Sequence, residues 1–142
     1  MQAILASAGT SLAGLPQFLI YLAAAAALVI LFIVLYSLLT PQHEIALIRR
    51  GNTAAAITLG GAILGFAIPL SKSISQSRDL VDMLVWSAVA LVVQLAVFFL
   101  SGLVIAHEAK KIEQGDLATA AFLAFAAASA GLVTAACMSY GP

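Results

Sequence analysis

Residues 49–71 read RRGNTAAAITLGGAILGFAIPLS. Two basic residues are followed by a Gly-Asn pair and then by an uncharged, mainly apolar run that reaches Ser71. A helix needs about 20 mainly apolar residues to cross the hydrocarbon core of a bilayer. The stretch therefore predicts a charged loop, a helix start and a membrane-spanning helix.

Three more uncharged runs of this kind lie on either side of it. Together they place membrane-spanning helices near 17–40, 53–71, 83–106 and 117–138. The runs are continuous and rich in Ala and Leu, whereas the strands of a membrane barrel would alternate over about ten residues. We therefore predict an all-α integral membrane protein with four transmembrane helices in a single membrane domain, residues 1–142.

The composition supports a lipid environment. The chain is 63% hydrophobic and 8% charged, against roughly 25% charged residues in soluble domains. Its net charge is zero and it has no dense basic tract, which argues against a nucleic-acid partner. The first apolar run is too long for the core of a signal peptide, so we expect it to stay in the mature protein. The lone Cys137 cannot form a disulfide within the chain.

The charged residues lie in three short connections, near 40–51, 71–82 and 107–115. Short connections make consecutive helices antiparallel, so the first and third loops share one side. These two loops carry four of the six basic residues: Arg49, Arg50, Lys110 and Lys111. Because cytoplasmic loops carry an excess of Lys and Arg, we expect loops 40–51 and 107–115 in the cytoplasm and both termini outside.

The two halves of the chain resemble each other at an offset of 64 residues. This offset superposes His43-Glu44 on His107-Glu108 and Gly51-Asn52 on Gly115-Asp116. Gly suits the left-handed residue after a helix, and Asn or Asp can cap the next helix. We predict a tandem repeat of two-helix hairpins, approximately 17–75 and 82–140, with both copies in the same orientation.

The first repeat should also contain a short helix at the membrane interface. Pro41 is expected to break the preceding helix, so that residues 41–50 form a separate short segment. The matching position, Ile105, carries no such break. The third long helix is therefore expected to continue to residue 106.

Small residues predict which helices pack closely. Gly and Ala at a spacing of four let membrane helices approach one another. We expect the second and fourth helices to form the inner pair and the first and third to face lipid. The packing residues expected in the inner pair are Gly60, Gly61, Gly65, Ala120, Ala124, Ala128 and Gly131.

Several segments resemble a known family. They are residues 50–57, Gly60-Gly61, residues 64–70, and the scattered positions Asp82, Trp86 and Gln94-Leu95. Over roughly 22–138 the chain resembles the DUF350 (UPF0719) family of small bacterial inner-membrane proteins. The resemblance implies tandem two-helix units in a bacterial cytoplasmic membrane. The family name records an unknown function, so it implies no mechanism and no catalytic residue.

Three polar residues near or inside the spans have two readings each. Asn52 and Asp116, at the starts of the second and fourth helices, could cap those helices or line a polar path, and both could hold at once. Gln94 lies mid-span and could bond to a neighbouring helix or contact a solute.

The paired residues His43-Glu44 and His107-Glu108 suggest a metal site only weakly. Adjacent residues on a helix point about 100° apart, so one ion could hardly use all four side chains. We expect interfacial charges that face water, with Glu108 pairing with Lys111, and no metal or cofactor. On the opposite side, Lys72, Arg78, Asp79 and Asp82 are expected to form a solvated outer loop.

The chain lacks the sequence signs of an enzyme. No nucleophile is paired with a recognisable base, and there is no Gly-rich phosphate loop, so we expect no catalytic residue. Four helices enclose little space, and a homo-oligomer is therefore expected. Our main hypothesis is passage of a small ion or polar solute along a lining of Asn52, Asp116, Gln94, His43, Glu44, His107 and Glu108.

The alternative is a membrane scaffold or accessory subunit. It would present its short charged loops to a cytoplasmic or envelope protein. The residues available for such a partner are Glu44, Arg49, Arg50, Lys110, Lys111 and Glu113.

Overall fold

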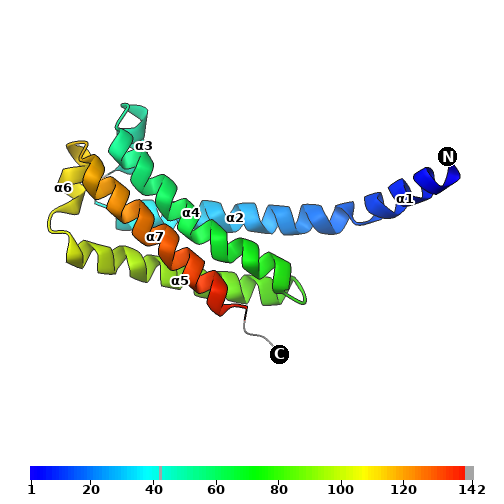
Figure 1. Cartoon of the computed structure of the whole chain (residues 1–142). Coiled ribbons are helices and arrows are strands. Elements are labelled where there is room, and N and C mark those ends of the chain that lie inside the picture. The colour runs from blue at the N-terminus through cyan, green and yellow to red at the C-terminus, as the bar shows by residue number, and fades with distance from the viewer. Residues whose placement is uncertain (42, 140–142) are drawn as a thin grey trace.

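A computed structural model describes residues 1–41 and 43–139, which form seven helices and no strand. In chain order these are α1 (Gln2–Ala13), α2 (Leu15–Leu39), α3 (Glu44–Arg49), α4 (Thr53–Gln76), α5 (Leu80–Val104), α6 (Glu108–Glu113) and α7 (Leu117–Cys137) (Figure 1). Four helical stretches of this part of the chain are long and apolar enough to cross a membrane: Gln2–Leu39, α4, α5 and α7. The prediction of an all-α fold with four such helices is confirmed.

The centre of the fold is the close pair of α4 and α7, which make the most extensive helix contact in the molecule. Gly61 faces Ala124, and Gly65 faces Ala127 and Gly131. Along this contact the residue numbers of α4 and α7 increase in the same direction, so the two helices run parallel (Figure 1). A Cβ atom at Gly61 or Gly65 would overlap the backbone of α7. The prediction that the second and fourth long helices pack closely is confirmed, but α7 is no more buried than α5, so only α4 is an inner helix.

One of the predicted packing residues lies outside this contact, and another is not the residue that meets Gly65. Gly60 is exposed, with no atom within 4 Å of the place a Cβ would take. On α7 it is Ala127, 8% exposed, that meets Gly65, in place of the predicted Ala128. A strict spacing of four drifts around a helix of 3.6 residues per turn, so the contact stripe must alternate steps of three and four.

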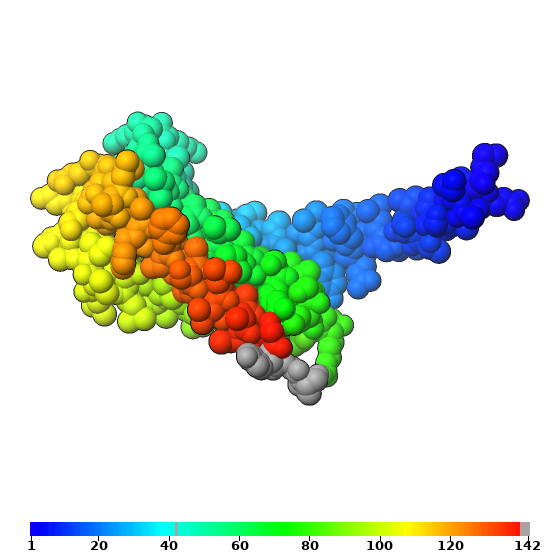
Figure 2. Space-filling model, viewed as in Figure 1, coloured from blue at the N-terminus to red at the C-terminus, as the bar shows by residue number. Residues whose placement is uncertain are grey.

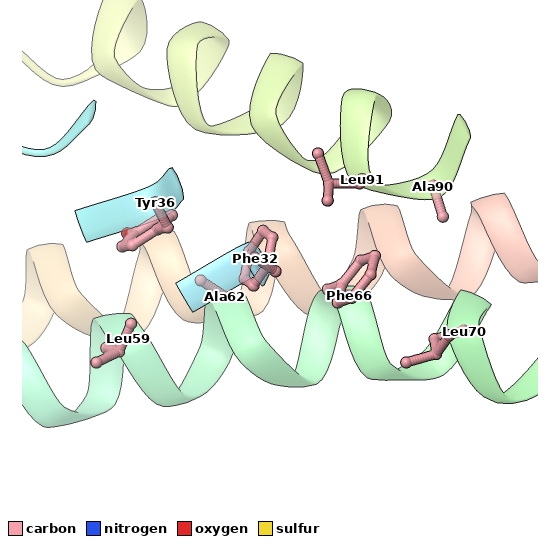
Figure 3. Packing of buried hydrophobic residues seen from close by; sticks show 8 residues of the cluster. All are labelled: Phe32, Tyr36, Leu59, Ala62, Phe66, Leu70, Ala90 and Leu91. Carbon is pink, nitrogen blue, oxygen red and sulfur yellow. The ribbon is translucent and has the colours of Figure 1, made fainter. Parts of the chain in front are cut away.

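The other long helices surround this pair unequally. α5 packs against both α4 and α7, whereas α2 contacts α4 and α5 mainly through its C-terminal part, where its buried residues lie. Phe32 of α2 stacks on Phe66 of α4 with ring centres 4.9 Å apart (Figure 3). Aromatic pairs of this geometry add to the stabilisation from buried apolar area. This contact anchors one end of α2 to the bundle.

The N-terminal part of the chain extends away from the bundle. Figures 1 and 2 show α1 and the first turns of α2 as an arm that projects from the compact body. No residue of α1 is buried. Helix α1 was not predicted, because the first apolar run was counted only from residue 17. Pro16 lies in the first turn of α2, where its missing N–H costs little.

The connection between α4 and α5 is shorter than predicted. α4 continues to Gln76, so Lys72 belongs to a helix and only residues 77–79 join the two helices. The Asp79 carboxylate accepts a hydrogen bond of 2.9 Å from the Asp82 N–H and so caps α5. The predicted solvated loop is thus a tight, capped helix junction.

The α3–α4 and α6–α7 junctions have the same geometry. Gly51 and Gly115 adopt φ values of 84° and 79°. In both, the glycine N–H donates to the carbonyl three residues back, and the next N–H donates to the carbonyl five residues back, at 2.9–3.0 Å. These bonds end one helix as the Asn52 or Asp116 side chain begins the next. The predicted sequence of stop and cap is confirmed at both places.

The helix break before α6 was not predicted. α5 ends at Val104 although Ile105 is no proline, and His107 makes the turn with a left-handed φ of 60°. A histidine tolerates this conformation better than a β-branched residue. The expectation of a helix continuing to residue 106 is therefore wrong. The tandem repeat stays a prediction, and position 140, where we ended the second copy, lies outside the described residues.

Candidate functional site

A small cavity lies inside the bundle. Its volume is about 20 Å³, enough for about one water molecule. The polar residues that line it are Tyr36, Thr58, Gln94, Ser101 and Glu108, and the apolar ones include Ala62, Phe98 and Leu123. Side chains from α2, α4, α5, α6 and α7 thus meet at this point.

Glu108 turns its side chain inward from the start of α6. Its Oε1 atom lies beside Gly102 of α5, so close that a Cβ there would come within 2.9 Å. Its Oε2 atom is buried and has no hydrogen-bond partner among the described residues. Burial raises the pKa of the Glu108 carboxyl above its ordinary value. Glu108 as a whole is half-buried, so the prediction that it faces water is wrong for this oxygen, and the glycine leaves room for the carboxyl group at α5.

A second glutamate lies beside the cavity. Glu44, the first residue of α3, is 1% exposed, which contradicts the prediction that it faces water. The Tyr36 hydroxyl donates a hydrogen bond to the Glu44 side chain, and both Glu44 and Glu108 lie close enough to act on this hydroxyl electrostatically. Figure 3 shows Tyr36 facing the part of α4 that carries Leu59 and Ala62. The two glutamates that coincide at the offset of 64 residues thus approach the same tyrosine.

The histidines do not share this environment. His43 and His107 are exposed, and neither belongs to the lining of the cavity. Within the described ranges, no group of three or more His, Cys, Asp or Glu side chains is placed to hold a metal ion. The polar lining predicted from sequence is therefore split, with the carboxylates inside and the imidazoles outside.

Gln94 lies on the cavity wall between α5 and α7. It is 4% exposed, and its Nε2 atom donates a hydrogen bond of 3.3 Å to the Ala127 carbonyl. The predicted bond to a neighbouring helix is confirmed. The same side chain also lines the cavity, and its contact with a solute stays a prediction.

Asn52 joins the two halves of the chain. Its Oδ1 accepts a hydrogen bond of 3.0 Å from the Ala55 N–H and caps α4. Its Nδ2 donates to the carbonyls of Ile112 and Glu113, at 2.9 and 3.2 Å. Asn52 therefore holds the end of α6 while it starts α4. It lines an open pocket of about 570 Å³ between the two junctions and not the small cavity.

The hydrogen bonds of the Asp116 side chain stay within the second half of the chain. It accepts hydrogen bonds from the Ala118 N–H at 3.0 Å and the Thr119 hydroxyl at 2.7 Å. The bond from Thr119 lowers the pKa of the Asp116 carboxyl below its ordinary value. The capping prediction is confirmed for both residues, and the structure places neither at the buried cavity.

Three polar residues of the cavity were not predicted from the sequence: Tyr36, Thr58 and Ser101. Each is a hydroxyl-bearing residue inside an apolar run, where a hydroxyl commonly bonds to its own helix. One signal was available, because Ser37 and Ser101 coincide at the 64-residue offset. The convergence of the three residues depends on how α2, α4 and α5 cross, which no local pattern shows.

Comparison with known proteins places the chain in a family. The sequence profile described as Domain of Unknown Function (DUF350) matches residues 10–138. The chain belongs to the DUF350 family. The UPF0719 inner membrane protein YjfL of Escherichia coli, strains K12 and O157:H7, is similar to this DUF350 chain, with 38% identity over 114 residues, 80% of this chain and 86% of the relative.

A more distant relative comes from another bacterium. The UPF0719 transmembrane protein YshE of Bacillus subtilis (strain 168) is 34% identical over 80 residues, which are 56% of this chain and 60% of that protein. No solved structure gives a significant match. The family resemblance drawn from the segments around Gly51, Gly65 and Gln94 is confirmed.

Proposed function

We propose that this DUF350 protein passes a small ion or polar solute across a bacterial inner membrane as a homo-oligomer. The observation that supports this proposal is the polar cavity, in which Glu108 turns a carboxyl group into a bundle of membrane-length helices. The names of the Escherichia coli relatives support the inner membrane as its location. The proposal assigns no catalytic residue.

The cost of burying a carboxyl group supports a functional role for it. Ionisable groups among membrane helices are expensive and usually mark ion or proton paths. An apolar residue at position 108 would fill the same space against Gly102 without this cost. A structural role alone therefore explains Glu108 poorly.

The size of the cavity supports an oligomer. A space of about 20 Å³ in one bundle is far too small to form a continuous path across a bilayer. Several copies around a common axis could complete such a path. In the orientation we propose, the α3 and α6 end, with its four basic residues, faces the cytoplasm.

A flux assay tests this proposal. Purified protein in liposomes should carry a flux of protons or small cations, and Glu108→Gln should reduce that flux at least tenfold. Glu113→Gln is the matched control, because Glu113 lies on the same short helix with an exposed side chain. Passage is rejected if ions of both signs and small polar solutes show no flux above protein-free liposomes.

The scaffold role is the second candidate. Arg49, Arg50, Lys110, Lys111 and Glu113 are all exposed at the α3 and α6 end, which favours a docking surface there. Glu44 is buried and does not belong to this surface. If this candidate is right, reversing the charge of Arg49 and Arg50 should release a co-purifying protein. Unchanged co-purification after that reversal would argue against it.

A further inference from the structure

We propose that the Glu108 cavity binds one small monovalent cation, of the size of Na⁺, in competition with a proton. This inference rests on the proposed function and names the class of ion that the site takes.

The hydrogen bonds around the cavity point their donors away from it. The Thr58 hydroxyl donates to the Ala54 carbonyl at 2.9 Å, and the Gln94 amide donates to the Ala127 carbonyl. The Tyr36 hydroxyl donates to Glu44. A hydroxyl has one proton to donate and two lone pairs. These bonds leave the lone pairs of the Thr58 and Tyr36 hydroxyls free to face the cavity.

The Oε2 atom of Glu108 is buried and has no hydrogen-bond partner among the described residues. A buried carboxylate oxygen without a hydrogen-bond donor is unfavourable. No donor among the described residues lies within hydrogen-bond distance of this oxygen. A cation in the cavity would compensate the carboxylate and accept coordination from the lone pairs around it.

The size and charge of the site favour a small monovalent ion. A volume of about 20 Å³ holds about one water-sized particle. Carboxylate, carbonyl and hydroxyl oxygens are ligands of hard cations. Glu108 is the one carboxylate in the lining, and the neighbouring Glu44 carboxyl already accepts the Tyr36 hydrogen bond. A monovalent ion therefore neutralises the carboxylate that faces the cavity, whereas a divalent ion would bring one more positive charge than that carboxylate balances.

A proton competes for the same oxygen. Burial of Glu108 favours its protonated form. The titratable groups that face it are Tyr36 on α2 and Glu44 on α3, while the lining parts of α4, α5 and α7 contribute Thr58, Gln94, Ser101 and apolar side chains. As the pH falls through the pKa of Glu108, the proton should displace the cation. The apparent Kd for the cation should then rise about tenfold for each pH unit.

Thermal unfolding in detergent tests the binding directly. The purified protein is heated in NaCl, KCl or choline chloride at equal ionic strength, from pH 5 to pH 8. Because a ligand that binds the folded state raises the Tm, we expect a higher Tm in NaCl than in KCl or choline chloride, with a difference that shrinks at low pH. Glu108→Gln should abolish this difference and Glu113→Gln should keep it.

A second variant covers the case in which Glu108→Gln does not fold. Thr58→Val keeps the shape of the side chain and removes one lone-pair donor, so it should weaken the Na⁺ effect on Tm several-fold. Equal Tm values in NaCl and choline chloride for the unmodified protein overturn the inference. An Na⁺ effect that survives Glu108→Gln also overturns it.

Failure of the Na⁺ site and failure of the proposed passage give different experimental results. Na⁺ binding that needs Glu108 but no flux in liposomes would uphold the site and reject passage. Flux without any Na⁺ effect on Tm would uphold passage and reject the site.

Discussion

The Asn52 side chain ties α4 to the end of α6, and we expect Asn52→Asp to break that tie while it keeps the helix cap. An aspartate can still accept the hydrogen bond from the Ala55 N–H. It cannot donate to the carbonyls of Ile112 and Glu113, which now receive bonds of 2.9 and 3.2 Å. A carboxylate oxygen would face these two carbonyl oxygens.

The geometry sets the size of the effect. Two hydrogen bonds at a net value of about 1 kcal/mol each are lost. A negative charge at the start of α4 returns about 0.3–1 kcal/mol through the helix dipole. We therefore expect Asn52→Asp to lower the free energy of unfolding by about 1–2 kcal/mol, with faster hydrogen exchange at the end of α6.

The matched control is Gln114→Glu. Gln114 is exposed and lines the same open pocket as Asn52, so this variant adds the same negative charge at the same end of the molecule. Both variants are compared by denaturant unfolding in detergent micelles and by hydrogen exchange. If Gln114→Glu is as destabilising as Asn52→Asp, the added charge and not the lost bonds explains the effect, and our reading of Asn52 is refuted.

Three further predictions concern helix packing and pH. Gly61→Ala should destabilise by about 1–3 kcal/mol in thermal unfolding because its Cβ overlaps α7, whereas Gly60→Ala, with open space around it, should be neutral or slightly stabilising. Gln94→Leu removes the bond to the Ala127 carbonyl and should cost about 0.6–1.7 kcal/mol, measured by the same unfolding assay. The pKa of Asp116 is lowered by its Thr119 bond, so its contribution to stability is complete above the ordinary aspartate pKa and is lost as the pH falls through the lowered value; unfolding scans of Asp116→Asn should lack this acid dependence.

The sequence predicted the helices well where a strong local signal exists. Apolar runs gave the four spans to within a few residues, except at the N-terminal arm and at the end of α4. Gly51 and Gly115 marked two junctions correctly, because a left-handed residue followed by a capping side chain is a local feature. His107 makes a similar turn without a distinctive residue type, so the end of α5 was missed.

The site was harder to predict because it depends on contacts between distant segments. Glu44 and Glu108 were chosen from their matching positions, but their burial requires a tyrosine on α2 and a glycine on α5. Asn52 and Asp116 occupy matching positions in the two halves, and Asn52 differs by carrying an amide group in place of a carboxylate. Only the structure shows that this group reaches across to α6.

The left-handed backbone at Gly51 and Gly115 has a stereochemical consequence. No atom lies within 4 Å of the place a Cβ would take at either residue, so volume alone would accept a side chain there. Their φ values of 84° and 79° would still cost an L-amino acid roughly 1–2 kcal/mol. A D-alanine, the mirror-image residue, adopts this conformation without that cost. The two junctions therefore select for handedness and not for size.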